Sequence, residues 1–293
     1  MSLLDRTPGP LQEVELQLEE LEARVVPGCR LWLREWAGSS VRGCLAEIEE
    51  FRSSDTYGIR KARVTKVIER LVSRFATLKE RLDDMDREQF GPLQDKLRAR
   101  SYHRADFEAD LAALAPYERD AFTLKLLGID WHPDRTTERP RDQVYYEASS
   151  VAATLDVLDQ VQPGDVLYDL GCGLGIVLLL AAWLTDAASI RGVEYEPAYV
   201  ETARERAAYF GFDRVDVVCA DAQTVDYRDG TIFYFFHPFG GETLAKVLES
   251  LRQISLQRKL RICARGACRH YFLDEPWMTL VRELPSGVRI FET

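Results

Sequence analysis

The sequence lacks the features that mark a membrane-spanning or exported protein. Its longest uninterrupted apolar stretch runs from Ile176 to Leu184, far short of the roughly 20 residues that cross a bilayer as a helix. The stretch from Met1 to Pro10 has no apolar core of the kind found in secretory signals. We therefore expect a soluble, cytoplasmic protein with no membrane partner.

The cysteines are few and follow no disulfide or metal-binding pattern. None of the six forms a Cys-x-x-Cys pair, and a chain of 293 residues can bury a core without disulfides. No clustered His, Cys or Asp spacing predicts a metal site. We expect buried, reduced thiols and no metal at Cys29, Cys44, Cys172, Cys219, Cys263 and Cys268.

The sequence also has fewer basic than acidic residues. Lys and Arg number 38 against 48 Asp and Glu, which gives a formal net charge of −10. An acidic total disfavours a broad surface that follows a phosphate backbone, so we expect no nucleic-acid partner, although a local basic groove can exist within it. A small molecule or a basic peptide fits this charge better.

The first half of the chain has the periodicity of helices. Apolar residues spaced by three and four predict a helix over residues 11–25, and a second over 29–51. Heptad-like spacing from Val64 to Met85 predicts a third helix that could pair two copies as a homodimer. Shorter helices are expected at 87–98, 107–114 and 116–127. This half either selects substrate, forms a dimer or simply covers the second domain.

From Val166 onward the pattern changes to alternating strands and helices. Residues 128–143, with prolines and charges but little periodicity, are typical of a linker or lid. We expect an all-α helical bundle domain at 1–140, followed at 141–293 by an α/β domain with a Rossmann-like, doubly wound, mostly parallel sheet. The expected strands are 166–170, 189–193, 215–219, 232–236, 260–264 and 288–291; the expected helices are 151–161, 175–184, 198–209, 243–251 and 276–284.

A glycine turn lies between the first of these strands and its helix. The residues from Val166 to Leu180 read V-L-Y-D-L-G-C-G-L-G-I-V-L-L-L. Glycines at this point let the backbone approach a nucleotide-like ligand. The spacing is G-x-G-x-G rather than the G-x-G-x-x-G of dinucleotide sites, and no Gly-Lys-Ser/Thr follows, so neither a pyrophosphate nor a triphosphate is the expected ligand.

The segment Asp169-Leu170-Gly171-Cys172-Gly173-Leu174-Gly175 resembles the first motif of the class I S-adenosylmethionine-dependent methyltransferases. The resemblance covers roughly residue 144 to residue 293. It implies S-adenosyl-L-methionine as cofactor. The residues that it places against the cofactor in this turn are Asp169, Gly171, Cys172, Gly173 and Gly175, with Cys172 serving as a small packing residue.

Acidic residues end the next two strands. Glu194 follows the second strand, beside the glycine turn, where a carboxylate can accept hydrogen bonds from both ribose hydroxyls; the alternative is an ordinary exposed acid. Asp221 follows the third strand and resembles the family's acceptor for the adenine amino group, while the backbone N–H of Ala222 would reach a ring nitrogen.

The fourth strand ends in Phe236-His237-Pro238-Phe239. Many amine-methylating members have Asp, Asn or Ser there, followed by Pro-Pro and an aromatic residue, so this chain departs from their pattern. His237 stands about where the acid or amide would be and could remove a proton or orient the acceptor; alternatively it is a packing or turn histidine. Pro238 and Phe239 are expected to contact the acceptor.

The segment Val144-Tyr145-Tyr146-Glu147-Ala148-Ser149 is similar to the V-Y-G-E-T-S loop of histone-lysine methyltransferases of the disruptor-of-telomeric-silencing type. In those enzymes the loop folds over the methionine end of the cofactor. Tyr145, Glu147 and Ser149 match and are expected at the cofactor, and Tyr146, which does not match, at the acceptor. The alternative is a helix start in which Ser149 or Ser150 caps the helix.

These patterns together predict a methyltransferase (EC 2.1.1.-) that acts on an N or O nucleophile of a small-molecule or peptide-like acceptor. A protein-lysine methyltransferase and a non-catalytic cofactor-binding scaffold remain alternatives. An aminopropyltransferase would need paired acids after the fourth strand, and an NAD-dependent dehydrogenase would need its third glycine one residue later.

Overall fold

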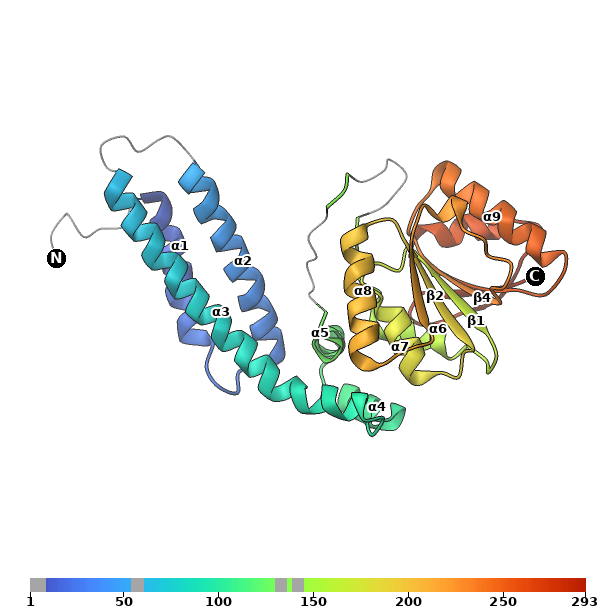
Figure 1. Ribbon diagram of the computed structural model, residues 1–293, viewed down its shortest axis with the longest axis horizontal. Helices are drawn as coiled ribbons and strands as arrows, with labels where there is room; N and C mark the ends of the chain where they lie inside the picture. The colour runs from blue at the N-terminus through green and yellow to red at the C-terminus, as the bar shows by residue number, and fades with distance from the viewer. Residues whose placement is uncertain (1–8, 54–60, 130–135, 139–144) are drawn as a thin grey trace. The chain divides into compact units, whose positions relative to one another are not determined.

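The computed structural model describes residues 9–53, 61–129, 136–138 and 145–293 (Figure 1). The chain divides into two compact units. The first comprises residues 1–93 and 115–122, and the second comprises residues 94–114 and 123–293. A boundary between domains at residue 140 stays a prediction.

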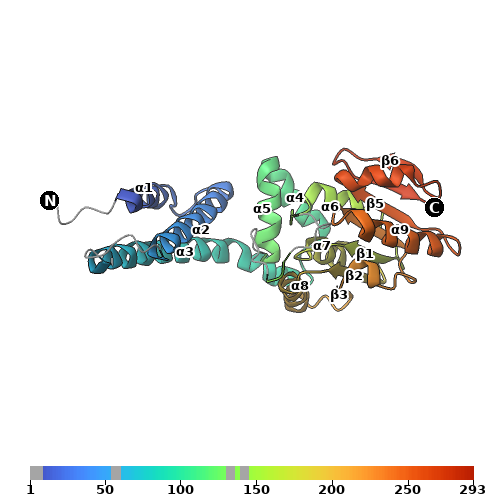
Figure 2. The ribbon, with the colours of Figure 1, turned by 90° about the horizontal axis from the view of Figure 1, so that it is seen from above.

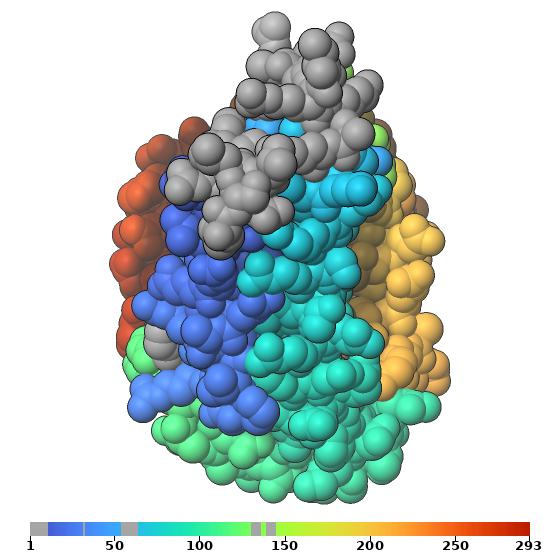
Figure 3. Space-filling model, turned by 90° about the vertical axis from the view of Figure 1, so that its left-hand side faces the viewer, coloured from blue at the N-terminus to red at the C-terminus, as the bar shows by residue number. Residues whose placement is uncertain are grey.

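The first unit is built on three helices, α1 (Gly9–Arg24), α2 (Leu31–Ser53) and α3 (Lys61–Arg98). The predicted apolar stripes of α1 and α3 are confirmed, because both face one shared core with α2. Figure 3 shows the outer surfaces of α1 and α3 side by side. The buried residues of this core are Leu11, Val14, Leu18, Leu21, Val25, Ala37, Val41, Cys44, Ile48, Val64, Ile68, Leu71, Phe75, Leu78 and Leu82.

The expectation of separate helices at 64–85 and 87–98 is wrong, because α3 is continuous and contains Pro92. No glycine or proline interrupts residues 85–90, and the buried Phe90 extends the apolar side of the helix. Its ring packs edge-on against Phe122, with ring centroids 5.4 Å apart. Packing of this kind outweighs the hydrogen bond that a proline removes from a helix interior.

The second unit is a seven-stranded sheet in the order β3-β2-β1-β4-β5-β7-β6. The first five strands in this order are parallel, and β7 is antiparallel to both of its neighbours, β5 and β6. This confirms the doubly wound, mostly parallel fold predicted from the alternating pattern. The strands are β1 (Val166–Leu170), β2 (Ser189–Glu194), β3 (Val215–Cys219), β4 (Ile232–Phe236), β5 (Arg261–Arg265), β6 (Thr279–Glu283) and β7 (Arg289–Glu292).

Helices cover both faces of this sheet (Figures 1 and 2). On one face, α9 (Gly241–Ser255) packs on a core rich in aromatic side chains from β1 and β4, including Tyr168, Phe233 and Phe235. The opposite face carries α6 (Val151–Leu158), α7 (Ile176–Leu184) and α8 (Pro197–Phe210). The unit also contains α4 (Arg104–Ala113) and the 3₁₀ segments η3 (Ala222–Thr224) and η4 (Ala267–Asp274). The helix α5 (Pro116–Leu127) is divided, with residues 116–122 in the first unit and residues 123–127 in the second.

The helix expected at 276–284 is wrong, because residues 279–283 form the edge strand β6. The missed signal is the Pro285-Ser286-Gly287 turn, which joins β6 to β7 as a hairpin. Leu284 donates its N–H to the Val288 carbonyl at 2.8 Å. Gly287 has a φ of 83°, a conformation that glycine adopts without strain.

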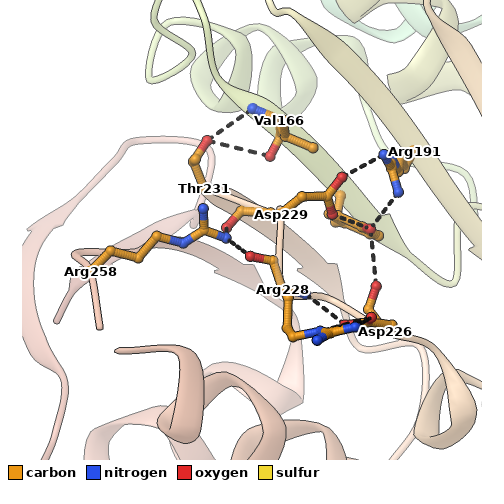
Figure 4. Close-up of polar contacts among 9 residues, drawn as sticks. Val166, Arg191, Asp226, Arg228, Asp229, Thr231 and Arg258 are labelled. Atoms are coloured by element: carbon orange, nitrogen blue, oxygen red, sulfur yellow. Dashed lines mark hydrogen bonds and ion pairs between the residues drawn. The ribbon is translucent and has the colours of Figure 1, made fainter. Parts of the chain in front are cut away.

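A polar network fixes the strands at their amino-terminal edge (Figure 4). Thr231 accepts the Val166 N–H at 2.9 Å and so ties the start of β4 to the start of β1. Asp229 accepts the Tyr168 hydroxyl at 2.8 Å and pairs with Arg191 of β2 at 2.5 Å. Three neighbouring strands are thereby held in register at the edge opposite their carboxyl ends.

Candidate cofactor and active site

A cavity of about 300 Å³ lies at the carboxyl ends of the five parallel strands. In a doubly wound sheet this edge is where ligands bind. Most of the predicted site residues line it. Its lining residues are Tyr145, Tyr146, Glu147, Gly171, Val193, Glu194, Tyr195, Tyr199, Ala220, Asp221, Ala222, Phe236, His237, Pro238, Phe239, Thr243, Gly266 and Ala267.

The glycine turn after β1 has no room for side chains. Gly171, Gly173 and Gly175 have φ values of 75°, 53° and 81°. A Cβ on Gly171 would collide with the Pro238 side chain, and one on Gly173 would lie 2.5 Å from the ring of Tyr146. The turn therefore requires glycine both for its backbone conformation and for close packing.

Glu194 ends β2 and holds this turn. Its Oε2 accepts the Gly173 N–H at 2.9 Å, and its Oε1 accepts the N–H groups of Tyr195 and Glu196 at 2.8 and 2.9 Å. The carboxylate lines the cavity beside the glycine turn, as the strand order requires. Its role toward a ribose stays a prediction.

Asp169 is buried at the end of β1. Burial and the nearby Glu194 carboxylate raise the pKa of Asp169 to about 8. The residue lines a second, smaller cavity of about 30 Å³, which shares Tyr146, Glu147, Gly171 and Phe236 with the first. Asp169 is thus close to the main cavity but outside its lining.

Cys172 is a packing residue within the turn. Its side chain is buried, and its Sγ would lie 2.6 Å from a Cβ on Gly192 of β2. Burial, Asp169 and Glu194 raise the pKa of the Cys172 thiol well above its usual range. The thiol is therefore protonated and is no nucleophile at neutral pH.

Asp221 and Ala222 lie in the cavity wall after β3. The Asp221 carboxylate accepts hydrogen bonds from the backbone and side chain of Gln223, at 3.1 and 2.6 Å, and so caps η3. The Ala222 carbonyl accepts the hydroxyl of the buried Tyr227 at 2.7 Å. This wall is rigidly held by its own hydrogen bonds.

Residues 145–147 line the main cavity, and residues 146–149 line the smaller one. Tyr146 lies over Gly173, and its ring packs edge-on against Tyr199, with centroids 5.3 Å apart. Tyr145 is 80% exposed and Glu147 is also exposed, yet both line the cavity. Val144 lies outside the described residues.

Ser149 and Ser150 make different contacts, and a role of Ser149 toward the cofactor stays a prediction. The Ser149 hydroxyl lies 3.1 Å from the hydroxyl of the buried Tyr234 and lines the smaller cavity. Ser150 caps α6, because its side chain accepts the Ala153 N–H. The predicted serine cap is thus confirmed at Ser150.

His237 has an unusual backbone. Its φ of 43° is in the left-handed region, which costs a residue with a side chain roughly 1–3 kcal/mol. Its N–H donates to Cys268 Sγ at 3.3 Å, and a Cβ on Gly266 would lie 3.0 Å from the His237 Cβ. Cys268 and Gly266 therefore help to hold His237 at the cavity, where Pro238 and Phe239 also lie.

Glu196 was not predicted from the sequence, yet it holds a segment beside the site. The buried carboxylate accepts hydrogen bonds from the backbone and hydroxyl groups of Thr136 and Thr137, at 2.6 to 3.1 Å. Burial alone would raise the pKa of Glu196, but these hydrogen bonds outweigh it and lower the pKa to about 2. The available signal was an acid just before Pro197, at a helix start.

Other cavity residues were also missed, namely Val193, Tyr195, Tyr199, Ala220, Phe236, Thr243, Gly266 and Ala267. They lie at or after strand ends or open the next helix, so only the assembled sheet brings them together. Within the described ranges, no group of three or more His, Cys, Asp or Glu side chains could hold a metal ion. No helix in the described part of the chain is long and apolar enough to cross a membrane.

Residues 167–254 match the family model described as a methyltransferase domain. Two curated relatives are each 26% identical to the chain. The uncharacterized protein MJ1452 of Methanocaldococcus jannaschii aligns over 106 residues, 36% of this chain and 37% of its own. The carboxy-S-adenosyl-L-methionine synthase of Sulfurimonas denitrificans aligns over 117 residues, 38% of this chain and 49% of its own. The chain thus spans less than half the length of these relatives.

Among solved structures, an RNA methyltransferase from Salinibacter ruber in complex with S-adenosyl-L-homocysteine is 20% identical, with a TM-score of 0.39. The match covers 50% of this chain and 92% of that one. The sheet order and the family model agree on the same region of the second unit. By these two findings, residues 167–254 lie on a Rossmann-like sheet and match the methyltransferase-domain family.

Proposed function

We propose that the chain binds S-adenosyl-L-methionine and transfers its methyl group to an N or O nucleophile of a small-molecule or peptide-like acceptor. The observation that carries this proposal is the convergence of the glycine turn, Glu194 and Asp221 on one cavity at the carboxyl ends of parallel strands. A relative named for a carboxylated form of S-adenosylmethionine supports a ligand of this class.

The residues of the cavity fit this cofactor. The glycine turn leaves a surface of backbone close to the ligand, because a Cβ at Gly171 or Gly173 has no room. Glu194 and Asp221 are hydrogen-bond acceptors suited to hydroxyl and amino groups. The cavity lining includes three acids and no lysine or arginine, which suits a cationic sulfonium.

Once bound, the cofactor supplies a methyl group that its sulfonium has already activated. The chain then has to orient the acceptor, exclude water and receive a proton where the nucleophile carries one. Tyr146 and Phe239 both line the cavity, and the Tyr146 ring packs against Tyr199. His237, which follows β4 and lines the cavity, is the residue that we expect to orient the nucleophile or accept its proton.

Calorimetry of the purified protein with S-adenosylmethionine tests the first half of the proposal, with NAD as the control ligand. We expect binding of S-adenosylmethionine alone. Incubation with methyl-labelled cofactor and fractionated cell extract then tests transfer. Binding without transfer to any fraction would favour the non-catalytic scaffold, and transfer only to protein lysines would favour the lysine methyltransferase.

A further inference from the structure

Three arginines gather around the β6–β7 turn, beside the cavity. Arg265 ends β5, Arg269 lies in η4 and Arg289 begins β7. Arg265 Nε donates to the Ser286 carbonyl at 3.3 Å, and Arg269 Nη1 donates to the Gly287 carbonyl at 3.3 Å. Since β7 runs antiparallel to β5, this turn lies at the same sheet edge as the cavity.

Two of these charges have no acid to balance them. Arg289 pairs with Glu283 at 3.1 Å. Within the described residues, Arg265 and Arg269 form no ion pair, and their hydrogen bonds go to neutral carbonyls. The Asp156 carboxylate of α6, which reaches the same turn, accepts the Ser286 hydroxyl.

Both side chains also contain a buried donor that makes no hydrogen bond. Arg265 Nη1 and Arg269 Nε are buried without a partner among the described residues. A buried donor on a charged group is costly when it is unsatisfied. Two such donors on neighbouring unpaired arginines indicate a missing anionic partner.

The two arginines act on neighbours of His237, namely Phe236 and Cys268. The Arg265 guanidinium lies 4.4 Å from the ring centroid of Phe236, which lines the cavity. Arg269 is close enough to Cys268 to lower the pKa of its thiol, against the larger effect of burial. Cys268 in turn accepts the His237 N–H.

We propose that Arg265 and Arg269 form an anion subsite at the edge of the cavity, which binds a carboxylate or phosphate group of the acceptor. The planar guanidinium donors match the oxygens of such groups. This inference rests on the proposed function, since it defines the chemical class of the acceptor. The acceptor is then an anionic small molecule rather than a lysine-rich peptide.

Inorganic phosphate and acetate are the probes of the subsite itself. Calorimetry would compare the parent with Arg265→Gln, Arg269→Gln and the double variant. The control is Arg282→Gln, which changes an exposed arginine on the neighbouring strand β6. We expect each subsite variant to weaken anion binding by roughly tenfold, and the control to bind like the parent. Unchanged anion binding in the double variant would overturn the proposal.

The source of the anion is tested with methyl-labelled cofactor and cell extract separated by ion exchange into anionic, neutral and cationic small molecules. Label in the anionic fraction, lost in the double variant, supports an acceptor-borne anion. Absence of label from that fraction, or label only in a lysine peptide, overturns the acceptor assignment. Calorimetry with S-adenosylmethionine distinguishes failure of the proposed function from failure of the anion subsite. If the parent does not bind S-adenosylmethionine, the proposed function is contradicted. If the parent and all variants bind it, the anion-binding result alone decides on the subsite.

Discussion

The Glu194 carboxylate accepts the Gly173 N–H at 2.9 Å, so the acid that ends β2 also holds the glycine turn that follows β1. Glu194 and the glycine turn, two parts of the proposed cofactor site, are therefore directly connected by a hydrogen bond. A change at Glu194 would loosen the turn and, at the same time, remove the contact that we propose with the cofactor.

Glu194→Gln is expected to weaken S-adenosylmethionine binding at least tenfold, because a charge-assisted hydrogen bond contributes about 1.5–3 kcal/mol. Calorimetry measures the affinity. Glu201→Gln, an exposed substitution on α8, is the matched control and should bind like the parent. Equal affinities for the two variants would show that Glu194 does not contact the cofactor.

The pH dependence of stability should reveal Asp169. Its pKa is about 8 in the folded protein against an ordinary value of 3.8, so the folded state binds more protons between these pH values. The contribution of Asp169 to the free energy of unfolding therefore decreases as pH rises through this window. Urea denaturation without ligand at pH 5 to 8 should show a smaller decrease in Asp169→Asn than in the parent. Parallel curves would contradict the raised pKa.

Substitution of Gly171 should cost more stability than substitution of a glycine in a similar conformation elsewhere. Gly164 has a φ of 88° and nothing within 4 Å of a Cβ, so Gly164→Ala should cost only the backbone strain of about 1–2 kcal/mol. Gly171→Ala adds a collision with Pro238. Chemical denaturation compares the two variants, and similar losses would mean that Pro238 moves aside freely.

Substitution of His237 by glycine should relieve backbone strain, whereas any substitution of His237 should slow methyl transfer. Its left-handed backbone is strained with a side chain present, so His237→Gly should be stabilised by about 1 kcal/mol relative to His237→Ala. Both variants should bind cofactor but transfer methyl groups more slowly. Thermal denaturation and methyl-transfer assays test the two parts. An unchanged transfer rate would make His237 a packing residue.

Glu196→Ala should release residues 136 and 137. Loss of the carboxylate leaves the donors of Thr136 and Thr137 without their acceptor, at a cost of about 1.5–3 kcal/mol. Amide hydrogen exchange should accelerate at these two residues. Because the pKa of Glu196 is lowered to about 2, the stabilisation is present above pH 4.5 and decreases as pH falls toward 2. Unchanged amide hydrogen exchange at these residues would show that Glu196 does not hold them in place.

Local patterns were sufficient for most of the second unit. The strands β1 to β5 are short β-branched or aromatic runs between turn signals, and the glycine turn is a local motif. The strand β6 was missed because Pro276 resembled a helix start, although its partner β7 was predicted and the turn between them is a local hairpin signal. Strand pairing, unlike helix periodicity, depends on residues elsewhere in the chain.

The candidate site was predictable where strand order alone brings residues together, as for Glu194 and the glycine turn. Contacts between side chains far apart in the sequence were not. Glu196 meets Thr136 across 60 positions, and Cys268 meets His237 across 31. The arginine cluster likewise depends on the hairpin turn, because Arg265 and Arg269 donate hydrogen bonds to carbonyl groups of the turn that lie farther along the chain.

The position of β6 has a consequence for behaviour at high concentration. All five of its residues are exposed at the edge of the sheet, with Leu280 and Val281 at 40% and 53% exposure. An edge of this kind can template aggregation by adding strands from other molecules. The strand is short and ends in Arg282 and Glu283, whose charges oppose further growth of the sheet and so keep the molecules apart.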